Sequence, residues 1–507
     1  MTPLTGVQSL DARAVAPVAA PLLALLAVLL LDAVAPAARR VRHLHDALAL
    51  LGLLGAGTAV VVLARDGAER STACVPGGGL DVSACSYVVS PLTLGLQAVV
   101  LAAAVVCLLL AVDGPGAADR TPHHVLLLAT VAGAVALAGA RDLATLVVAL
   151  ETATLPTVGL VALRRDPQGA QGAVTFLLTA LTSLGLLLVG VGLIVAATGS
   201  AHLDRIAAAL GEPGLPTGAR AVAVLGTLVA VAGIAFKLSA VPFHLWTPDT
   251  YAGAPLPVAA LLSTVSKTAG AAAVVVLLGT GVLPLAAAWA PVVGGLAALT
   301  ITVGNLVALR QRVAVRLLAW STVAQAGWVL LPLGGAADTP REARLAVSGA
   351  VGYLAAYVAA TLAVFAVVVV LARHHRAGEE HSLDAYRGLA RREPVAAAVL
   401  AFGLACLAGL PPGLVGLVAK VVAVRPVVHA AAWPLALVAA ANVALGLVYY
   451  LRWAALLFGA PAEGTDGVPT WQVRPAEGVA LGASAGACLV LSVWPQFVAG
   501  LAPGVLR

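Results

Sequence analysis

Apolar runs follow one another along almost the whole chain and are separated by short polar connections. A run of about 20 apolar residues crosses a bilayer as a helix, in which every backbone N–H and C=O group finds a partner within the protein. Only 10% of the residues are charged, against roughly 25% in an ordinary soluble domain. The sequence therefore predicts an all-α polytopic membrane protein surrounded by a lipid bilayer.

The spacing of the runs predicts about fourteen transmembrane helices in a single membrane domain over residues 1–507. The expected spans are 17–35, 47–64, 91–112, 123–140, 143–163, 172–197, 219–240, 257–280, 285–308, 314–333, 345–372, 394–421, 432–456 and 477–500. No soluble domain is expected, so any redox catalysis would take place in another chain.

Arginine is concentrated in alternate connections, which predicts an orientation. Sixteen arginines fall in one set of connections, and the remaining ten fall in the other set and at the termini. The positive-inside rule makes the richer set cytoplasmic, with both termini outside the cytoplasm of a cell inner (plasma) membrane. Because the arginines form no continuous basic face, the formal charge of +6 does not indicate a nucleic-acid partner.

Only three of the 29 Lys and Arg residues are lysines, and all three, Lys237, Lys267 and Lys420, lie in apolar runs. A desolvated ammonium can release its proton, whereas a guanidinium stays charged, so these lysines are candidates for proton transfer. Glu151 is the only ionisable residue of the fifth run, where a carboxylate costs about 2.5–3.5 kcal/mol. We expect Glu151 to face Lys237. The alternatives are a structural ion pair and, for Lys267, a side chain that extends to the membrane interface.

Two expected helices contain residues that interrupt a helix. Pro242 lies five residues after the seventh-helix lysine, whereas Pro411 and Pro412 lie at least eight residues before the twelfth-helix lysine. Proline removes a backbone donor, and broken helices at membrane depth usually line a polar cavity. We therefore expect helices 7 and 12 to be broken beside a polar cavity, although simple kinks would also explain the prolines.

The reversed order of lysine and break predicts two inverted five-helix repeats. The first repeat would occupy 123–280 and the second 285–456, with flanking helices in 17–112 and 477–500. This symmetry rests on the placement of the breaks, because the sequence shows no strong residue-level repetition.

His244, Cys74 and Cys85 are candidates for secondary roles. His244 follows the seventh-helix break and is either a secondary proton relay or a hydrogen-bond partner of loosened backbone. The two cysteines share the polar loop STACVPGGGLDVSACSY, expected outside the cytoplasm, and are either disulfide-bonded or free. The chain has no CxxC, CxxCH or strand-GxGxxG-helix pattern, so we expect no metal and no bound cofactor.

Several segments resemble one known family. FKLSAVPFHLWTPDTYAGAPLPVAALLSTVSK, with RLLAWSTVAQAGW, LAGLPPGLVGLVAK and NVALGLVYYLR, is similar to subunit N of proton-translocating NADH-quinone oxidoreductase, the respiratory complex I. The likeness extends from about residue 90 to 460. TPDTYAGAP is its most specific part, because related antiporter-like subunits usually read W-L-P-D-A there.

The resemblance implies that Glu151, Lys237, Lys267 and Lys420 are the proton-transfer residues of one antiporter-like channel. It also implies that quinone, NADH, FMN and iron-sulfur clusters belong to other subunits, and that other membrane subunits of complex I are the partners. The tenth helix has Gln325 where the family often has histidine, so water would have to bridge that stretch.

The function implied is proton conduction across the membrane, coupled to quinone reduction elsewhere in the complex. One alternative is a subunit of a multisubunit sodium/proton antiporter, which would share most of these residues. Another is a structural membrane subunit whose buried charges only fix helix packing.

Overall fold

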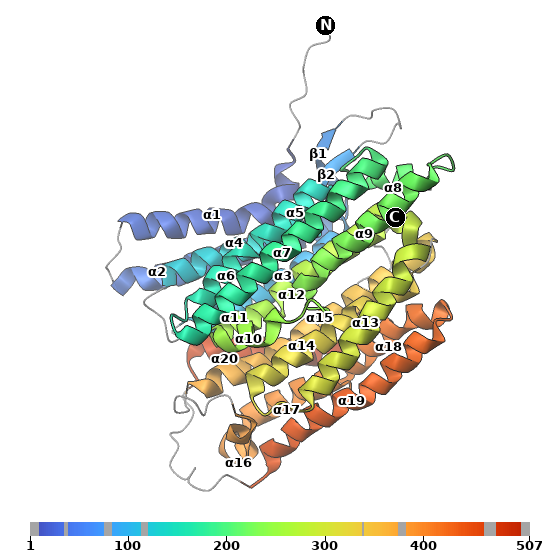
Figure 1. The fold of residues 1–507 in the computed structure, drawn as a ribbon. Helices are drawn as coiled ribbons and strands as arrows, with labels where there is room; N and C mark the ends of the chain where they lie inside the picture. Colours follow the sequence, from blue (N-terminus) through green and yellow to red (C-terminus); the bar gives the residue numbers. More distant parts are fainter. Residues whose placement is uncertain are drawn as a thin grey trace.

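The computed structural model describes residues 10–34, 39–75, 84–112, 120–336, 339–373, 382–460 and 473–497. Most of these residues form helices that run side by side in one bundle (Figure 1). In this described part, thirteen helical segments are long and apolar enough to cross a membrane, and Pro394–Ala408 is a shorter apolar helix. The prediction of an all-α polytopic membrane protein with about fourteen transmembrane helices is confirmed.

The elements of the N-terminal half are α1 (Ala12–Val34), α2 (Arg39–Asp66), β1 (Arg70–Val75), β2 (Ala84–Val89), α3 (Pro91–Ala111), α4 (Arg120–Ala138), α5 (Leu143–Thr152), α6 (Leu155–Ala162), α7 (Pro167–Thr198), α8 (Leu203–Gly211), α9 (Thr217–Leu238), α10 (Trp246–Gly253), α11 (Leu256–Ser263), α12 (Val265–Val276) and the π-helical turn η2 (Leu277–Gly281). Those of the C-terminal half are η3 (Leu283–Leu285), α13 (Ala286–Ala308), α14 (Ala314–Leu330), η4 (Leu331–Gly335), α15 (Pro340–Ala372), η5 (Leu383–Tyr386), α16 (Leu389–Arg392), α17 (Pro394–Ala408), α18 (Leu414–His429), α19 (Trp433–Phe458) and α20 (Pro475–Val493).

Within the residues that the structure describes, four transmembrane segments are interrupted, not only the two that the prolines predicted. The seventh ends at Leu238, before a turn that contains Pro242, and the twelfth divides into α17 and α18 around Pro411 and Pro412. The span expected at 394–421 is therefore two short helices. The fifth divides between α5 and α6 and the eighth between α11 and α12, where the sequence predicted continuous helices.

The centre of the bundle is formed by the eighth and eleventh segments. The most apolar windows of Leu256–Gly281 and Arg341–Ala372 are completely buried, whereas those of the outer helices α1, α7, α19 and α20 are 28% buried. An outer helix keeps an apolar face for lipid, so this difference separates the lipid-facing helices from the enclosed ones. The broken eighth segment therefore lies where hydrocarbon cannot reach it.

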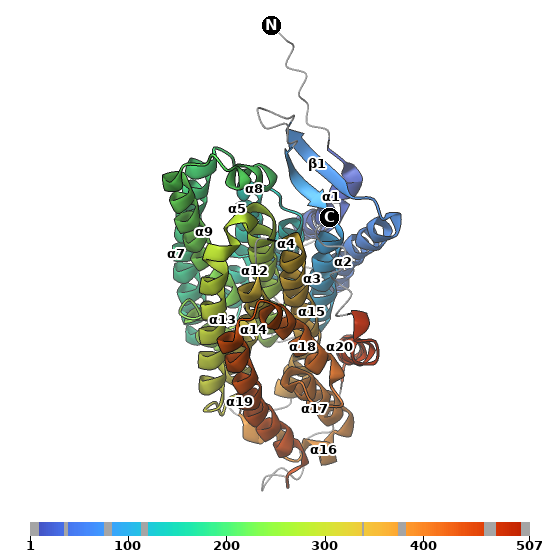
Figure 2. The same cartoon turned by 90° about the vertical axis from the view of Figure 1, so that its right-hand side faces the viewer.

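A two-stranded β-hairpin replaces the polar loop that the sequence predicted near the N-terminus. Strands β1 and β2 pair in antiparallel register, with Cys74 opposite Cys85, and a disulfide joins the two cysteines. The hairpin and α8 lie at one end of the bundle, and α16 lies at the other (Figure 2). The loop that joins the two strands lies outside the described residues.

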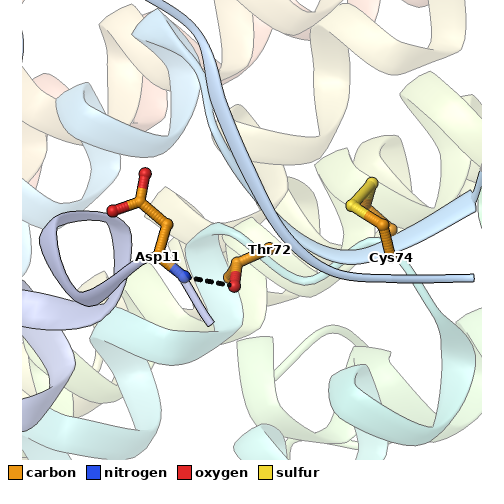
Figure 3. Close-up of a disulfide and its surroundings, with 4 residues drawn as sticks. Asp11, Thr72 and Cys74 are labelled. Atoms are coloured by element: carbon orange, nitrogen blue, oxygen red, sulfur yellow. Dashed lines mark hydrogen bonds between the residues drawn. A yellow bond between two sulfur atoms is a disulfide. The ribbon is translucent and has the colours of Figure 1, made fainter. Parts of the chain in front are cut away.

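The hairpin is fastened to the helices on both of its edges. On one side, the backbone N–H of Asp11 donates to the hydroxyl oxygen of Thr72 at 2.9 Å, next to the disulfide (Figure 3). On the other side, Val88 N donates to Gly139 O, and Arg141 N donates to Ser86 O, both at 2.9 Å. The two backbone contacts pair the outer edge of β2, which would otherwise be open to other chains, and the Thr72 hydroxyl connects β1 to the residue that precedes α1.

Candidate functional site

The break between α5 and α6 frees the backbone carbonyl of Ala153, two residues after Glu151, from its helical hydrogen bond. Pro156 lies in the first turn of α6, and the N–H of Thr157 donates to the carbonyl of Thr154 at 3.0 Å. In a continuous helix that N–H would bond the carbonyl of Ala153, four residues back. The Ala153 carbonyl is therefore available to a donor from another helix.

Gly133 of α4 packs directly against this break. A Cβ atom on Gly133 would lie 2.4 Å from the backbone nitrogen of Ala153 and 2.8 Å from the carbonyl oxygen of Ala149. Both are backbone atoms, which cannot move aside as the end of a flexible side chain can. The absence of a side chain at Gly133 thus allows α4 to support the interrupted fifth segment.

Lys237 reaches the break from the last turn of α9. Its Nζ donates to the hydroxyl oxygen of Thr154 at 2.9 Å and to the carbonyl oxygen of Ala153 at 3.3 Å. The lysine is 1% exposed, and the ring of Phe176 lies 5.9 Å from Nζ. Oxygen atoms and an aromatic face thus replace part of the water that an ammonium loses on burial.

Glu151 does not make the direct contact with Lys237 that the sequence predicted. No ion pair joins them in the described part of the chain, and Glu151 Oε2 has no hydrogen-bond partner there. Lys237 is still the charged group that acts on the carboxyl group electrostatically. The break supplies uncharged acceptors to the ammonium, so the structure holds it without the desolvation of a second charge.

Lys267, near the start of α12, binds the end of the helix that carries Lys237. Its Nζ donates to the carbonyl oxygen of Lys237 at 3.1 Å and to the hydroxyl oxygen of Ser239 at 2.5 Å. The indole ring of Trp246 lies 4.4 Å from the nitrogen, and Lys267 is 2% exposed. The last carbonyls of a helix carry partial negative charge, which stabilises a cation at this position. The alternative that Lys267 extends to the membrane interface therefore does not hold, because its nitrogen bonds groups inside the bundle.

Lys420 occupies a similar position on the other broken helix. Its Nζ donates to the carbonyl oxygen of Ala408, the last residue of α17, at 2.5 Å, and the ring of Trp328 lies 5.7 Å away. Gly409 follows with φ +78°, a conformation that glycine adopts without strain. Both Lys267 and Lys420 thus place an ammonium on the C-terminal carbonyls of an interrupted helix.

A cavity of about 480 Å³ lies beside Lys420. Its other lining residues include Leu417, Val421 and Val443, and Arg425 and His429 lie on the same helix as the lysine. Lys420 is 6% exposed, more than the other two lysines. Lys420 therefore lies at the wall of an open space.

His244 lies apart from these contacts. The side chain is 7% exposed, its ring lies 5.1 Å from that of Trp320, and Nδ1 has no hydrogen-bond partner among the described residues. No contact with the three lysines is present in that part of the chain. The structure therefore brings Lys237 and Lys267 together, places Lys420 at an analogous break, and leaves His244 outside the group.

Sequence analysis missed the groups that receive the ammonium ions. Thr154, Ser239 and Trp246 provide side-chain contacts, and Ala153 and Ala408 provide carbonyl oxygens. A signal existed for the fifth-segment break, because a proline at 156 weakens a continuous helix. The other acceptors depend on contacts between segments far apart in the sequence.

Comparison with known proteins identifies the family. The family described as NADH:quinone oxidoreductase/Mrp antiporter, TM, matches residues 140–446. NADH-quinone oxidoreductase subunit N 2 of Streptomyces griseus is 43% identical over 92% of this chain and 87% of its own length. NADH-quinone oxidoreductase subunit N of Salinispora tropica is 47% identical over 81% of this chain and 78% of its own length.

Solved structures agree with this assignment. A chain of respiratory complex I from Thermus thermophilus with bound aureothin superimposes with a TM-score of 0.77 at 28% identity, covering 96% of this chain and all of that chain. A chain of the Mrp complex from Dietzia shares the fold, with a TM-score of 0.78 at 21% identity, covering 96% of each chain. The chain therefore belongs to the NADH:quinone oxidoreductase/Mrp antiporter family and, within it, to the NADH-quinone oxidoreductase subunit N proteins.

Proposed function

We propose that this chain, as a membrane subunit of NADH-quinone oxidoreductase, conducts protons through Glu151, Lys237, Lys267 and Lys420. The observation that carries this proposal is the contact between the Lys267 ammonium and the backbone carbonyl of Lys237. Two buried amines at one helix break influence each other's charge, because like charges at short range in a poorly solvated site repel. A proton on one therefore disfavours a proton on the other.

The contacts of Lys237 suggest how charge transfer is controlled. Its ammonium rests on the acceptors at the α5–α6 break, while Glu151 stays unpaired two residues earlier. If the carboxylate approached, the protonated lysine would be stabilised; if it withdrew, the proton would be released toward Lys267. Approach and withdrawal of the Glu151 carboxylate would thus protonate and deprotonate Lys237 without redox chemistry in this chain.

The remaining assignments follow the family. We propose that the proton path runs from the first repeat (123–280) into the second, inverted repeat (285–456), and that both termini lie outside the cytoplasm. Movement of one proton against the membrane potential costs about 2.3 kcal/mol per 100 mV. We assign that energy to quinone reduction by NADH in partner subunits, which would carry FMN and the iron-sulfur clusters. Among the described residues, no group of three His, Cys, Asp or Glu side chains could hold a metal ion.

The sodium/proton antiporter is the weaker alternative. The relatives at 43–47% identity are named as subunit N proteins, whereas the Mrp chain at 21% identity shares only the fold. Glu151→Gln in the assembled complex separates the possibilities, because it keeps the side-chain shape and removes the charge. We expect NADH oxidation and assembly to persist while proton pumping falls in sodium-free vesicles.

Two other results would favour the alternatives. Proton flux that requires sodium in the unmodified protein would indicate an antiporter. A Glu151→Gln complex that fails to assemble, but pumps normally in the fraction that does assemble, would indicate a structural role for the carboxylate.

A further inference from the structure

Four buried polar side chains, here called the Gln325 cluster, lie where α14, α15 and α19 meet. They are Ser321, Gln325, Tyr353 and Tyr450, each 1–3% exposed. The Tyr353 hydroxyl donates to Gln325 Oε1, and Gln325 Nε2 donates to the Tyr450 oxygen at 2.9 Å. The Ser321 hydroxyl lies 2.5 Å from that of Tyr450. Every polar side chain of the cluster thus has a partner within it.

One side of the cluster approaches the Lys267 site. Tyr357 follows Tyr353 by one turn of α15, and its hydroxyl donates to the carbonyl of Ser263 at 2.7 Å. Ser263 is the last residue of α11 before the break that precedes Lys267. The Tyr357 hydroxyl also lies 3.2 Å from that of Thr322, the neighbour of Ser321. The Tyr357 and Thr322 hydroxyls therefore lie between the eighth-segment break and the helices that carry the cluster, within one helical turn of Tyr353 and Ser321.

The other side of the cluster approaches Lys420. The ring of Tyr353 stacks on that of Trp328, with centroids 5.7 Å apart and planes inclined by 16°. Trp328 also contacts the Lys420 ammonium, which lies 5.7 Å from its ring centre. The cluster therefore lies between the break that precedes Lys267 and the Trp328 ring that contacts Lys420, at the position where the tenth helix has the Gln325 amide.

We propose that the hydroxyl groups of Tyr353 and Tyr450 relay protons between Lys267 and Lys420, and that Gln325 is the positioning residue that holds both oxygens. This inference rests on the proposed function. A hydroxyl group has one donor and two acceptor sites, so it can receive a proton on oxygen while its own proton leaves. Gln325 accepts from Tyr353 and donates to Tyr450, which holds both hydroxyl oxygens in position.

The transfer conserves protons and charge. The Lys267 ammonium loses one proton through bridging water and becomes an amine. Each tyrosine oxygen takes up a proton from one bridging water as its own proton leaves to the next, so it is neutral before and after. The Lys420 amine receives the last proton through bridging water and becomes an ammonium, after which the hydroxyls rotate back to accept again.

The test is the double variant Tyr353→Phe/Tyr450→Phe in the complete complex, reconstituted into vesicles. Phenylalanine keeps the ring packing and removes only the two hydroxyls. We expect NADH oxidation to persist and the ratio of protons pumped to electrons transferred to fall to that of Lys420→Met. The matched control is Tyr386→Phe, a buried tyrosine whose hydroxyl has no hydrogen-bond partner among the described residues, which should keep the unmodified ratio.

A second pair of variants separates relay from packing. Gln325→Leu removes both hydrogen bonds and should lower the pumping ratio, whereas Gln325→His should keep it near the unmodified value, because an imidazole both accepts and donates. If the tyrosine double variant does not assemble, the pumping ratios of Gln325→Leu and Gln325→His test the relay in its place. An unmodified ratio in the double variant or in Gln325→Leu, with a lowered ratio in Lys420→Met, would overturn the relay and leave the proposed function standing. Unmodified ratios in all three variants would overturn both.

Discussion

Removal of the Thr154 hydroxyl, at the fifth-segment break, tests how the ammonium of Lys237 is held. Thr154→Val removes the hydroxyl that receives the Lys237 Nζ at 2.9 Å and keeps the side-chain shape. A hydrogen bond to a charged group is worth about 1.5–3 kcal/mol, which corresponds to a factor of roughly 10–150 in an equilibrium. We therefore expect the protonated lysine to occupy this position at least about tenfold less often, and proton pumping to fall accordingly.

The assay is proton uptake by vesicles that contain the purified complex, measured together with NADH oxidation. Thr154 also donates to the carbonyl of Leu150 at 2.6 Å, so its loss affects local structure as well as the lysine. Thr154→Ser restores both contacts and should recover pumping. Thr152→Val is the matched control, since among the described residues that hydroxyl donates to the carbonyl of Val148 at 2.7 Å and makes no hydrogen bond to a lysine. Equal pumping by Thr154→Val and Thr152→Val would refute the reasoning.

Two further predictions concern the fifth-segment break and the hairpin. Gly133→Ala would place a methyl group 2.4 Å from the backbone nitrogen of Ala153. We therefore expect the free energy of unfolding to fall by about 1–3 kcal/mol and proton pumping to fall as well. Gly192→Ala is the control, because nothing lies within 4 Å of its added Cβ atom, and it should behave as the unmodified protein in thermal melts and vesicle assays. The Arg70 side chain donates to Asp11 at 3.1 Å and holds the pKa of that carboxyl below its usual range. A lowered folded-state pKa means that the contact stabilises the folded protein above about pH 4 and is lost as the pH falls further. Hydrogen-exchange protection factors of β1 should fall in that acidic range and should depend less on pH in Arg70→Gln.

The helical architecture could be predicted because it depends on local sequence. Apolar runs of membrane length gave the number of helices, and Pro242, Pro411 and Pro412 located two of the breaks. The three lysines were also found from composition alone, since a titratable cation in an apolar run is rare. Their burial at 1–6% exposure agrees with that expectation.

Features that depend on contacts between distant segments could not be predicted. The eighth-segment break at Thr264 has no proline near it and lies where α11 and α12 are enclosed by other helices. The expected contact of Glu151 with Lys237 failed because an unpaired carbonyl at Ala153, created by the fifth-segment break, provides the acceptor instead. The sequence shows that a carboxylate and an ammonium are both buried, which suggests an ion pair. It does not show which backbone oxygens compete for the same ammonium.

The hairpin was missed for a different reason. A loop rich in glycine separates its two strands, and the flanking segments are too short to show a clear alternation of polar and apolar residues. Their pairing is supported by the bond between Cys74 and Cys85 and by docking on Asp11 and Arg141. Only the disulfide alternative could be anticipated from the shared loop.

The central claim is that protons pass through buried lysines that gain and lose charge. The most direct measurement is the ratio of protons pumped to electrons transferred by the reconstituted complex with Lys237→Arg, because arginine keeps the positive charge and cannot release its proton. We predict that NADH oxidation and assembly persist while this ratio falls. A ratio equal to that of the unmodified complex would contradict the account.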